Sequence, residues 1–149
     1  VEAWEKVGGN LVATEEVPAE KTSSYGIITP GKADGDLTEV LGLVEKPEPD
    51  VAPSRLGVIG RYILQPEVMR VLDAQDKGAG GEIQLTDAMA KLIGQQPFHA
   101  LKVNSARHDC GDKAGFVIAN LALALQRDDI APKVREFVSR TYGSSSTSQ

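Results

Sequence analysis

The sequence has very little cysteine, because Cys110 is the only one among 149 residues. A single thiol excludes a disulfide within the chain and leaves no cysteine pair for a zinc site. Long apolar runs are also missing, and the amino terminus lacks the basic segment followed by an apolar one that marks a signal peptide. We therefore expect a soluble cytoplasmic protein with no membrane partner.

An excess of basic residues is absent as well. The chain has 16 Lys and Arg against 21 Asp and Glu, a net charge of −5, and the basic residues are scattered among the acidic ones. Proteins that bind nucleic acid gather basic side chains into a patch or stripe, so we expect no nucleic-acid partner, although a local phosphate site fits this composition. Apolar residues make up 41% of the chain, which is enough for one good core.

Strand and helix patterns mix along the chain. The segments expected to form strands are 10–18, 25–29, 37–46, 55–64 and 98–103, with a turn at 30–36. One helix is expected from Pro66, and two more over 114–126 and 131–143. A further helix is expected after the glycine-rich stretch 78–81, because Leu85, Met89 and Leu92 follow at near-helical spacing. Because the strands include a hairpin, we predict an α/β fold with a mixed sheet and flanking helices.

The stretch "LGLVEKPEP" at 41–49 places two charged residues where a strand ends. Its apolar part, 41–44, predicts a strand buried on both faces. Glu45 and Lys46 follow, and Pro47 favours an extended backbone at the residue before it. A carboxylate accepts hydrogen bonds from sugar hydroxyls and an ammonium suits a phosphate oxygen, so the pair could hold a sugar phosphate. The alternative is a solvated surface pair, which stabilises a fold by less than about 1 kcal/mol.

The stretch "GAGGEIQLTD" at 78–87 joins a glycine-rich loop to a helix. Its glycines allow a tight turn or close approach of the backbone to a ligand. It is not a Walker loop, because no Gly-Lys-Ser/Thr closes it. Gln84 or Thr86 could cap the helix, and Glu82 or Asp87 suits its positive end, a reading that needs no ligand.

The stretch "HDCGDK" at 108–113 offers several reactive side chains. Asp109 is a hard oxygen ligand that could hold Mg²⁺. His108 could be a base and Cys110 a nucleophile, but sequence neighbours rarely have triad geometry, and a cysteine without a placed base is more often buried. The structural alternative is a turn in which Asp112 caps the helix that begins at Lys113.

Four segments, "YGII", "GLVEKPEPDVAPSRLGVIGRYIL", "GAGGEIQLTDAM" and "HDCGDKAGF", follow one another in this order. In order and spacing they closely resemble the bacterial UTP–glucose-1-phosphate uridylyltransferase family over residues 10 to about 142. The resemblance is to the carboxy-terminal half of that family, and it implies the second half of a Rossmann-like, glycosyltransferase-A-like nucleotidyltransferase fold. We expect a sugar-phosphate-binding half at 1–143, a flexible polar tail at 144–149, and no amino-terminal nucleotide-binding half.

The resemblance also implies a set of site residues. Glu45 would bind the glucose hydroxyls, and Lys46 would bind the sugar phosphate as the catalytic residue. Gly26 would approach the sugar through its backbone. Val58 and Tyr62 look similar to residues that line the sugar pocket.

The family's reaction converts UTP and glucose 1-phosphate to UDP-glucose and pyrophosphate. Such in-line chemistry rests on positioning and charge neutralisation, with no covalent protein nucleophile. Asp109 matches a position that helps to hold Mg²⁺ in related enzymes, whereas Gly81 departs from the acid usual in the family. The carboxy-terminal helices imply a homo-oligomer. We expect this chain to be inactive alone, and the alternative is a non-catalytic sugar-phosphate-binding or oligomerisation module.

Overall fold

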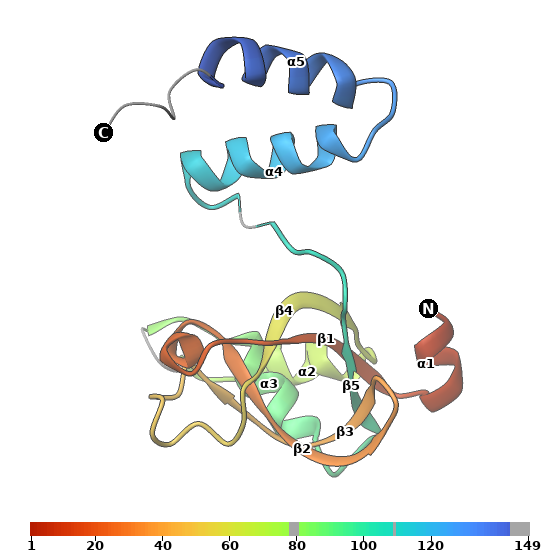
Figure 1. The fold of residues 1–149 in the computed structure, drawn as a ribbon. Helices are drawn as coiled ribbons and strands as arrows, with labels where there is room; N and C mark the ends of the chain where they lie inside the picture. Colours follow the sequence, from red (N-terminus) through yellow and green to blue (C-terminus); the bar gives the residue numbers. More distant parts are fainter. Residues whose placement is uncertain (78–80, 109, 144–149) are drawn as a thin grey trace. The chain divides into compact units, whose positions relative to one another are not determined.

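The computed structural model describes residues 1–77, 81–108 and 110–143 (Figure 1). The chain divides into two compact units, Val1–Asn104 and Ser105–Gln149. In the first unit the described residues form the helices α1 (Glu2–Val7), α2 (Glu67–Asp73) and α3 (Leu85–Leu92), the short 3-10 helix η1 (Ala19–Ser24), and the strands β1 (Asn10–Glu16), β2 (Gly26–Asp34), β3 (Leu37–Glu45), β4 (Leu56–Ile63) and β5 (Phe98–Lys102).

The strands pair in the order β1-β4-β2-β3-β5, and pairing of β5 with β1 closes them into a ring. The β1–β5 pair is parallel, whereas the other pairs are antiparallel. The predicted mixed sheet with flanking helices is therefore confirmed. Closure of the ring was not predicted, because β1 and β5 are distant in sequence and their pairing leaves no local pattern.

The turn expected at 30–36 is much shorter in the structure. β2 continues to Asp34, and the turn consists of Gly35 and Asp36. Pro30 lies where the β2–β3 register shifts, an irregularity that accommodates a residue with no backbone N–H. Gly35 has a φ of 60°, which glycine adopts at little cost.

β3 does not have the burial predicted for 41–44. Leu41 and Val44 are 56% and 45% exposed, whereas Val40 and Leu43 are buried. The register with β2 shifts at Leu41, which makes this residue a bulge. A bulge interrupts the alternation of faces, so Val40 and Leu43 both point into the core although they are an odd number of residues apart.

The core of the first unit lies between the inner face of the strands and the helices α2 and α3. Helix α3 packs against β3 and α2, and its apolar side follows the predicted spacing, since Met89 and Leu92 are buried. Each such side chain contributes about 1.5–3 kcal/mol on burial. The buried members of this core are Val12, Ile28, Val40, Leu43, Val68, Ala88, Met89, Leu92, Phe98 and Ala100.

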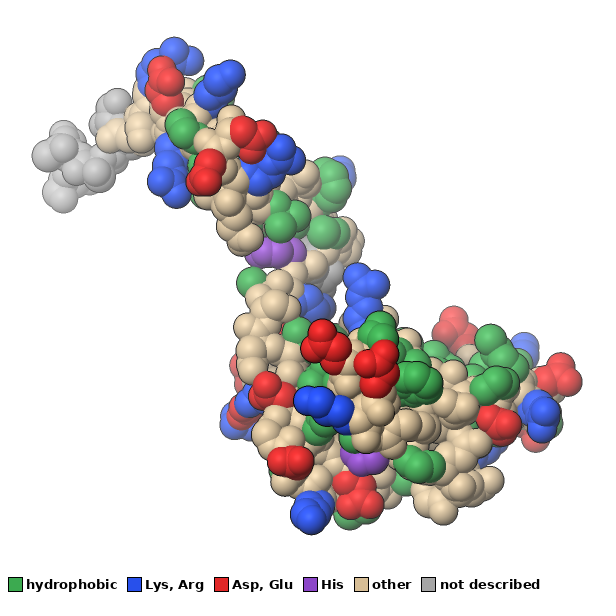
Figure 2. Space-filling model, turned by 90° about the vertical axis from the view of Figure 1, so that its right-hand side faces the viewer, with side chains coloured by type: hydrophobic (Ala, Val, Ile, Leu, Met, Phe, Trp, Pro, Cys, Tyr) green, Lys and Arg blue, Asp and Glu red, His purple; other side chains and the backbone are tan. Residues whose placement is uncertain are grey.

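The second unit contains α4 (Lys113–Leu125) and α5 (Ala131–Tyr142), close to the ranges predicted from the sequence. A carboxylate oxygen of Asp112 accepts a hydrogen bond from the Gly115 N–H at 2.8 Å. The predicted helix cap is therefore confirmed. None of the helices in the part of the chain that the structure describes has the length and apolar character needed to cross a membrane. On the face shown in Figure 2, acidic and basic side chains are interspersed.

Candidate functional site

The bulge in β3 determines where Glu45 lies. Glu45 is the last residue of β3 and pairs with Gly26, the first residue of β2. Two residues earlier, Leu43 contacts the core, so strand alternation places Glu45 on the same core-facing side. On β2, Gly26 lies two residues before the core residue Ile28, so it is also on the core-facing side. Gly26 and Glu45 therefore meet at the end of the inner face of the hairpin.

Lys46 has an unusual backbone. Among the described residues it is the one residue other than glycine with a positive φ, at 48°. The extended backbone predicted for the residue before Pro47 is therefore wrong. The Lys46 N–H donates to the Tyr25 carbonyl at 2.9 Å, which adds one bond beyond the end of the β2–β3 ladder. A left-handed conformation costs roughly 1–2 kcal/mol in a residue with a side chain, and such residues cluster at functional sites.

The charged groups of Glu45 and Lys46 lie close together. Lys46 Nζ is 3.7 Å from Glu45 Oε1, and the two side chains are 58% and 16% exposed, respectively. The alternative interpretation was a solvated surface pair. The structure differs from it, because the Glu45 carboxylate is largely shielded from water. A shielded carboxylate forms stronger hydrogen bonds than one in bulk water.

Tyr62 belongs to the same neighbourhood. Burial raises the pKa of its phenol, and the negative charge of Glu45 raises this pKa further. Tyr62 of β4 pairs with Val12 of β1, and Val58 pairs with Thr14. The register shifts between these two pairs. The bulge includes Gly60, whose φ is 75°. Gly26, Glu45 and Lys46 therefore lie together at one strand end, and Tyr62 is near enough to Glu45 for this charge to raise its pKa. Their roles in binding stay predictions.

Val58 is half-buried and packs against the hydrophobic core. Its contribution to a sugar pocket stays a prediction. Asp109, the predicted metal ligand, lies outside the described residues, as do residues 78–80 of the glycine-rich loop. Cys110 is a free, exposed thiol, so the expectation that it is buried is wrong. Within the described ranges, no cluster of three or more His, Cys, Asp or Glu side chains could hold a metal ion.

Thr86 lies beside Gly26, a position that was not predicted from the sequence. A Cβ added to Gly26 would lie 3.3 Å from Glu45 Oε2, 3.3 Å from Thr86 Cγ2 and 3.4 Å from Thr86 Oγ1. Thr86 is inside α3, whose N-cap is Gln84, and the Gln84 side chain makes no capping hydrogen bond. The predicted side-chain cap is therefore wrong. No local signal places Thr86 beside Gly26, because the contact depends on α3 packing back against β3.

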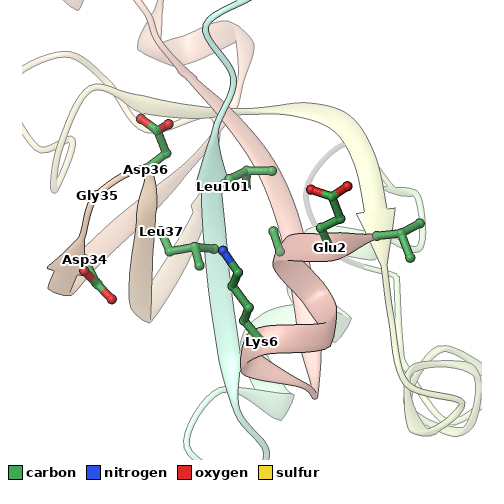
Figure 3. A pocket seen from close by; sticks show the side chains of 9 residues that line it. Glu2, Lys6, Asp34, Gly35, Asp36, Leu37 and Leu101 are labelled. Atoms are coloured by element: carbon green, nitrogen blue, oxygen red, sulfur yellow. The ribbon is translucent and has the colours of Figure 1, made fainter.

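A separate hollow lies between α1 and the turn of the β2–β3 hairpin (Figure 3). It has a volume of about 670 Å³, and in Figure 3 the Lys6 side chain extends toward Leu37. Its lining residues include Glu2, Asp34 and Asp36, and none of the site residues predicted from the sequence. This hollow does not contribute to the site at Glu45.

Comparison with known proteins relates this arrangement to a family. The family model for nucleotidyl transferase matches residues 2–126. UTP–glucose-1-phosphate uridylyltransferase of Komagataeibacter xylinus is 58% identical over 113 residues, which are 76% of this chain and 40% of that protein. The protein of the same name from Bacillus subtilis (strain 168) is 40% identical over 136 residues, covering 89% of this chain and 47% of that protein.

Solved structures agree with these relatives. UDP-glucose pyrophosphorylase complexed with UDP-glucose matches with a TM-score of 0.78 and 36% identity, covering 85% of this chain and 48% of that one. UTP-bound UGPase from Acinetobacter baumannii matches with a TM-score of 0.79 and 28% identity, covering 94% and 48%, respectively. The chain thus spans about half the length of the relatives that it matches. The predicted resemblance and its fold are confirmed, and the chain belongs to the nucleotidyl transferase family.

Proposed function

We propose that this chain carries the glucose 1-phosphate half-site of a nucleotidyltransferase that makes UDP-glucose and pyrophosphate from UTP and glucose 1-phosphate. The observation that supports it best is the convergence of a shielded carboxylate, an exposed ammonium and a bare glycine backbone at one strand end. Glu45 Oε1 and Lys46 Nζ are 3.7 Å apart there. The names of the relatives supply the identity of the two substrates.

Each residue of this site has a role that follows from its surroundings. The Glu45 carboxylate only accepts hydrogen bonds, so it would take the hydrogens of sugar hydroxyls. The Lys46 side chain is 58% exposed, so its ammonium is free to turn from Glu45 to a phosphate oxygen. Gly26 has no side chain that would displace Glu45 and would approach the sugar through its backbone. Tyr62 and Val58 would border the ring.

In the proposed reaction an oxygen of the sugar phosphate attacks the α-phosphorus of UTP. A new phosphorus–oxygen bond forms, and the bond from the α-phosphorus to the bridging oxygen breaks, so pyrophosphate leaves with the electron pair. Lys46 would fix the direction of the attacking phosphate and offset its negative charge. No side chain of this chain needs to form a covalent intermediate.

We also propose Mg²⁺ as the cofactor, with Asp109 as the ligand from this chain. A bound Mg²⁺ would neutralise charge on the triphosphate of UTP. A cytoplasmic location stays a prediction from the sequence.

A homo-oligomer formed through the carboxy-terminal helices is part of the proposal. The composition of α4 supports it, since helices that are apolar all round are normally buried. Phe116, Val117 and Ile118 are 58%, 62% and 60% exposed in the single chain. Sedimentation of the wild-type chain and of Val117→Lys tests this: a shift from oligomer to monomer is expected, and a monomeric wild-type chain would contradict it.

A hybrid enzyme tests the catalytic proposal directly. The chain would replace the matching segment of the Komagataeibacter xylinus relative, with which it shares 58% identity. We expect the hybrid to form UDP-glucose from UTP and glucose 1-phosphate, its Lys46→Ala version to lose that activity, and the chain alone to have none. A folded hybrid that binds sugar phosphate without turnover would favour the non-catalytic alternative.

A further inference from the structure

Thr86 and Glu45 both approach the backbone of Gly26, at the strand end to which the proposed function assigns the sugar. An added Cβ on Gly26 would be within 3.4 Å of both Glu45 Oε2 and Thr86 Oγ1. The bare Gly26 backbone is thus flanked by a carboxylate from β3 and a hydroxyl from α3. Gly26 does not have a positive φ, so its backbone conformation does not require glycine. The absence of a side chain instead lets Glu45 and Thr86 approach the backbone closely, because an added Cβ would be crowded by both.

The position of Thr86 is fixed by two independent attachments of α3. On its apolar side, Met89 and Leu92 are buried in the core. At its start, the Gln75 side-chain amide donates to the Gln84 carbonyl at 3.0 Å. Gln75 is only 9% exposed, and its own carbonyl oxygen accepts from Lys91 Nζ at 3.3 Å. A side chain held in this way can select among ligands, because it cannot move to suit each one.

The chemistry of the two flanking groups differs in a useful way. A carboxylate accepts hydrogen bonds only, whereas a hydroxyl both donates and accepts. Thr86 is half-buried, and no hydrogen bond from its side chain to another residue is found in the described part of the chain. Two such groups on either side of Gly26 suit two neighbouring ring hydroxyls with a defined relative orientation.

We propose that Thr86 is a specificity-determining residue whose hydroxyl hydrogen-bonds the ring hydroxyl next to the one bound by Glu45. This inference rests on the proposed function, since it concerns the same hexose. An epimer that turns one of the two hydroxyls away would lose a bond and leave a polar group unpaired, which is how a polar site rejects a close analogue.

Calorimetric titration of the chain with glucose 1-phosphate, galactose 1-phosphate and mannose 1-phosphate tests the proposal. Thr86→Val removes the hydroxyl at nearly constant shape, and Thr86→Ser keeps it. We expect Thr86→Val to weaken glucose 1-phosphate binding roughly three- to tenfold, the factor that a neutral hydrogen bond contributes. In Thr86→Val the preference for glucose 1-phosphate over at least one of the two epimers should become smaller. In Thr86→Ser, which keeps the hydroxyl, this preference should stay close to that of the wild-type chain.

The possible failures are distinguishable. Equal weakening for all three sugar phosphates, or no weakening at all, would overturn the role of Thr86 while leaving the half-site intact. A wild-type chain that binds none of the three would contradict the proposed function itself. Thermal unfolding of each variant, with midpoints close to the wild-type value, shows that Thr86→Val has not simply unfolded α3.

Discussion

The backbone N–H of Lys46 donates to the carbonyl of Tyr25 at 2.9 Å, one residue beyond the end of β3. This bond accompanies a φ of 48° at Lys46, a conformation that residues with a side chain rarely adopt. The resulting ammonium lies 3.7 Å from the Glu45 carboxylate. The strained backbone and the charge pair are therefore parts of one arrangement, and each can be tested separately.

Lys46→Asn should separate strain from binding. Asparagine tolerates the left-handed conformation, so the free energy of unfolding should stay unchanged or rise by up to about 1 kcal/mol. Binding of glucose 1-phosphate should weaken more than about tenfold, because a hydrogen bond to a charged group is lost. Urea denaturation and calorimetric titration measure the two effects.

Lys46→Val is the matched control for strain. A β-branched residue is poorly suited to positive φ, so this variant should be less stable than Lys46→Asn by about 1 kcal/mol or more. Both variants lack the ammonium and should bind sugar phosphate equally weakly. Equal stability of the two would show that the backbone at Lys46 is not strained.

Gly26→Ala should weaken sugar-phosphate binding with little effect on the fold. The new methyl group would lie 3.3 Å from both Glu45 Oε2 and Thr86 Cγ2, so these side chains must shift by a few tenths of an ångström. Gly35→Ala offers the opposite pattern, because Gly35 has a φ of 60° and open space around it. It should lower stability by roughly 1 kcal/mol and leave binding unchanged. Unaltered binding in Gly26→Ala would contradict the proposed position of the sugar.

Tyr62 should report the charge of Glu45. Burial and this charge both raise the pKa of the phenol above its ordinary value of 10.0. A raised pKa in the folded state favours the neutral phenol, so its contribution to stability is present below the ordinary pKa and is lost as pH rises through the folded-state pKa. Stability should therefore decline in the alkaline range.

Glu45→Gln should lower the pKa of Tyr62 toward its ordinary value without reaching it, because burial remains. Ultraviolet titration of the phenolate band measures this pKa, and subtraction of the Tyr62→Phe titration assigns the band to Tyr62. An identical Tyr62 titration with and without the Glu45 charge would show that the two side chains are not electrostatically coupled.

Asp112→Ala should destabilise the start of α4. The variant removes the acceptor of the Gly115 N–H, and loss of such a cap costs about 0.5–2 kcal/mol. Amide hydrogen exchange should become faster in the first turn of α4. Asp112→Asn keeps a capping oxygen and should exchange nearly as slowly as the wild-type chain; equal acceleration in both variants would point to the charge and not to the cap.

Local patterns account for what the sequence predicted well. Helical spacing identified Met89 and Leu92 as core residues, and Asp112 was recognised as a cap, because both depend on neighbours within a few residues. The motif around Glu45 and Lys46 identified the pair, and the structure places its charged groups within 3.7 Å.

Non-local contacts account for what the sequence did not predict. The bulge at Leu41 reverses which residues of β3 face the core, and nothing in the run 41–44 signals a register shift that is set by pairing with β2. The backbone of Lys46 depends on Tyr25, some twenty residues earlier. Thr86 approaches Gly26 only because α3 packs against β3.

An NMR titration with glucose 1-phosphate tests the central claim most directly. The amide signals of the chain of 149 residues would be followed as the sugar phosphate is added, with free glucose and inorganic phosphate as comparisons. We predict that the largest shifts occur at Gly26, Lys46 and Thr86, and that neither comparison reproduces them. Shifts confined to the hollow beside α1, or none at saturating sugar phosphate, would contradict it.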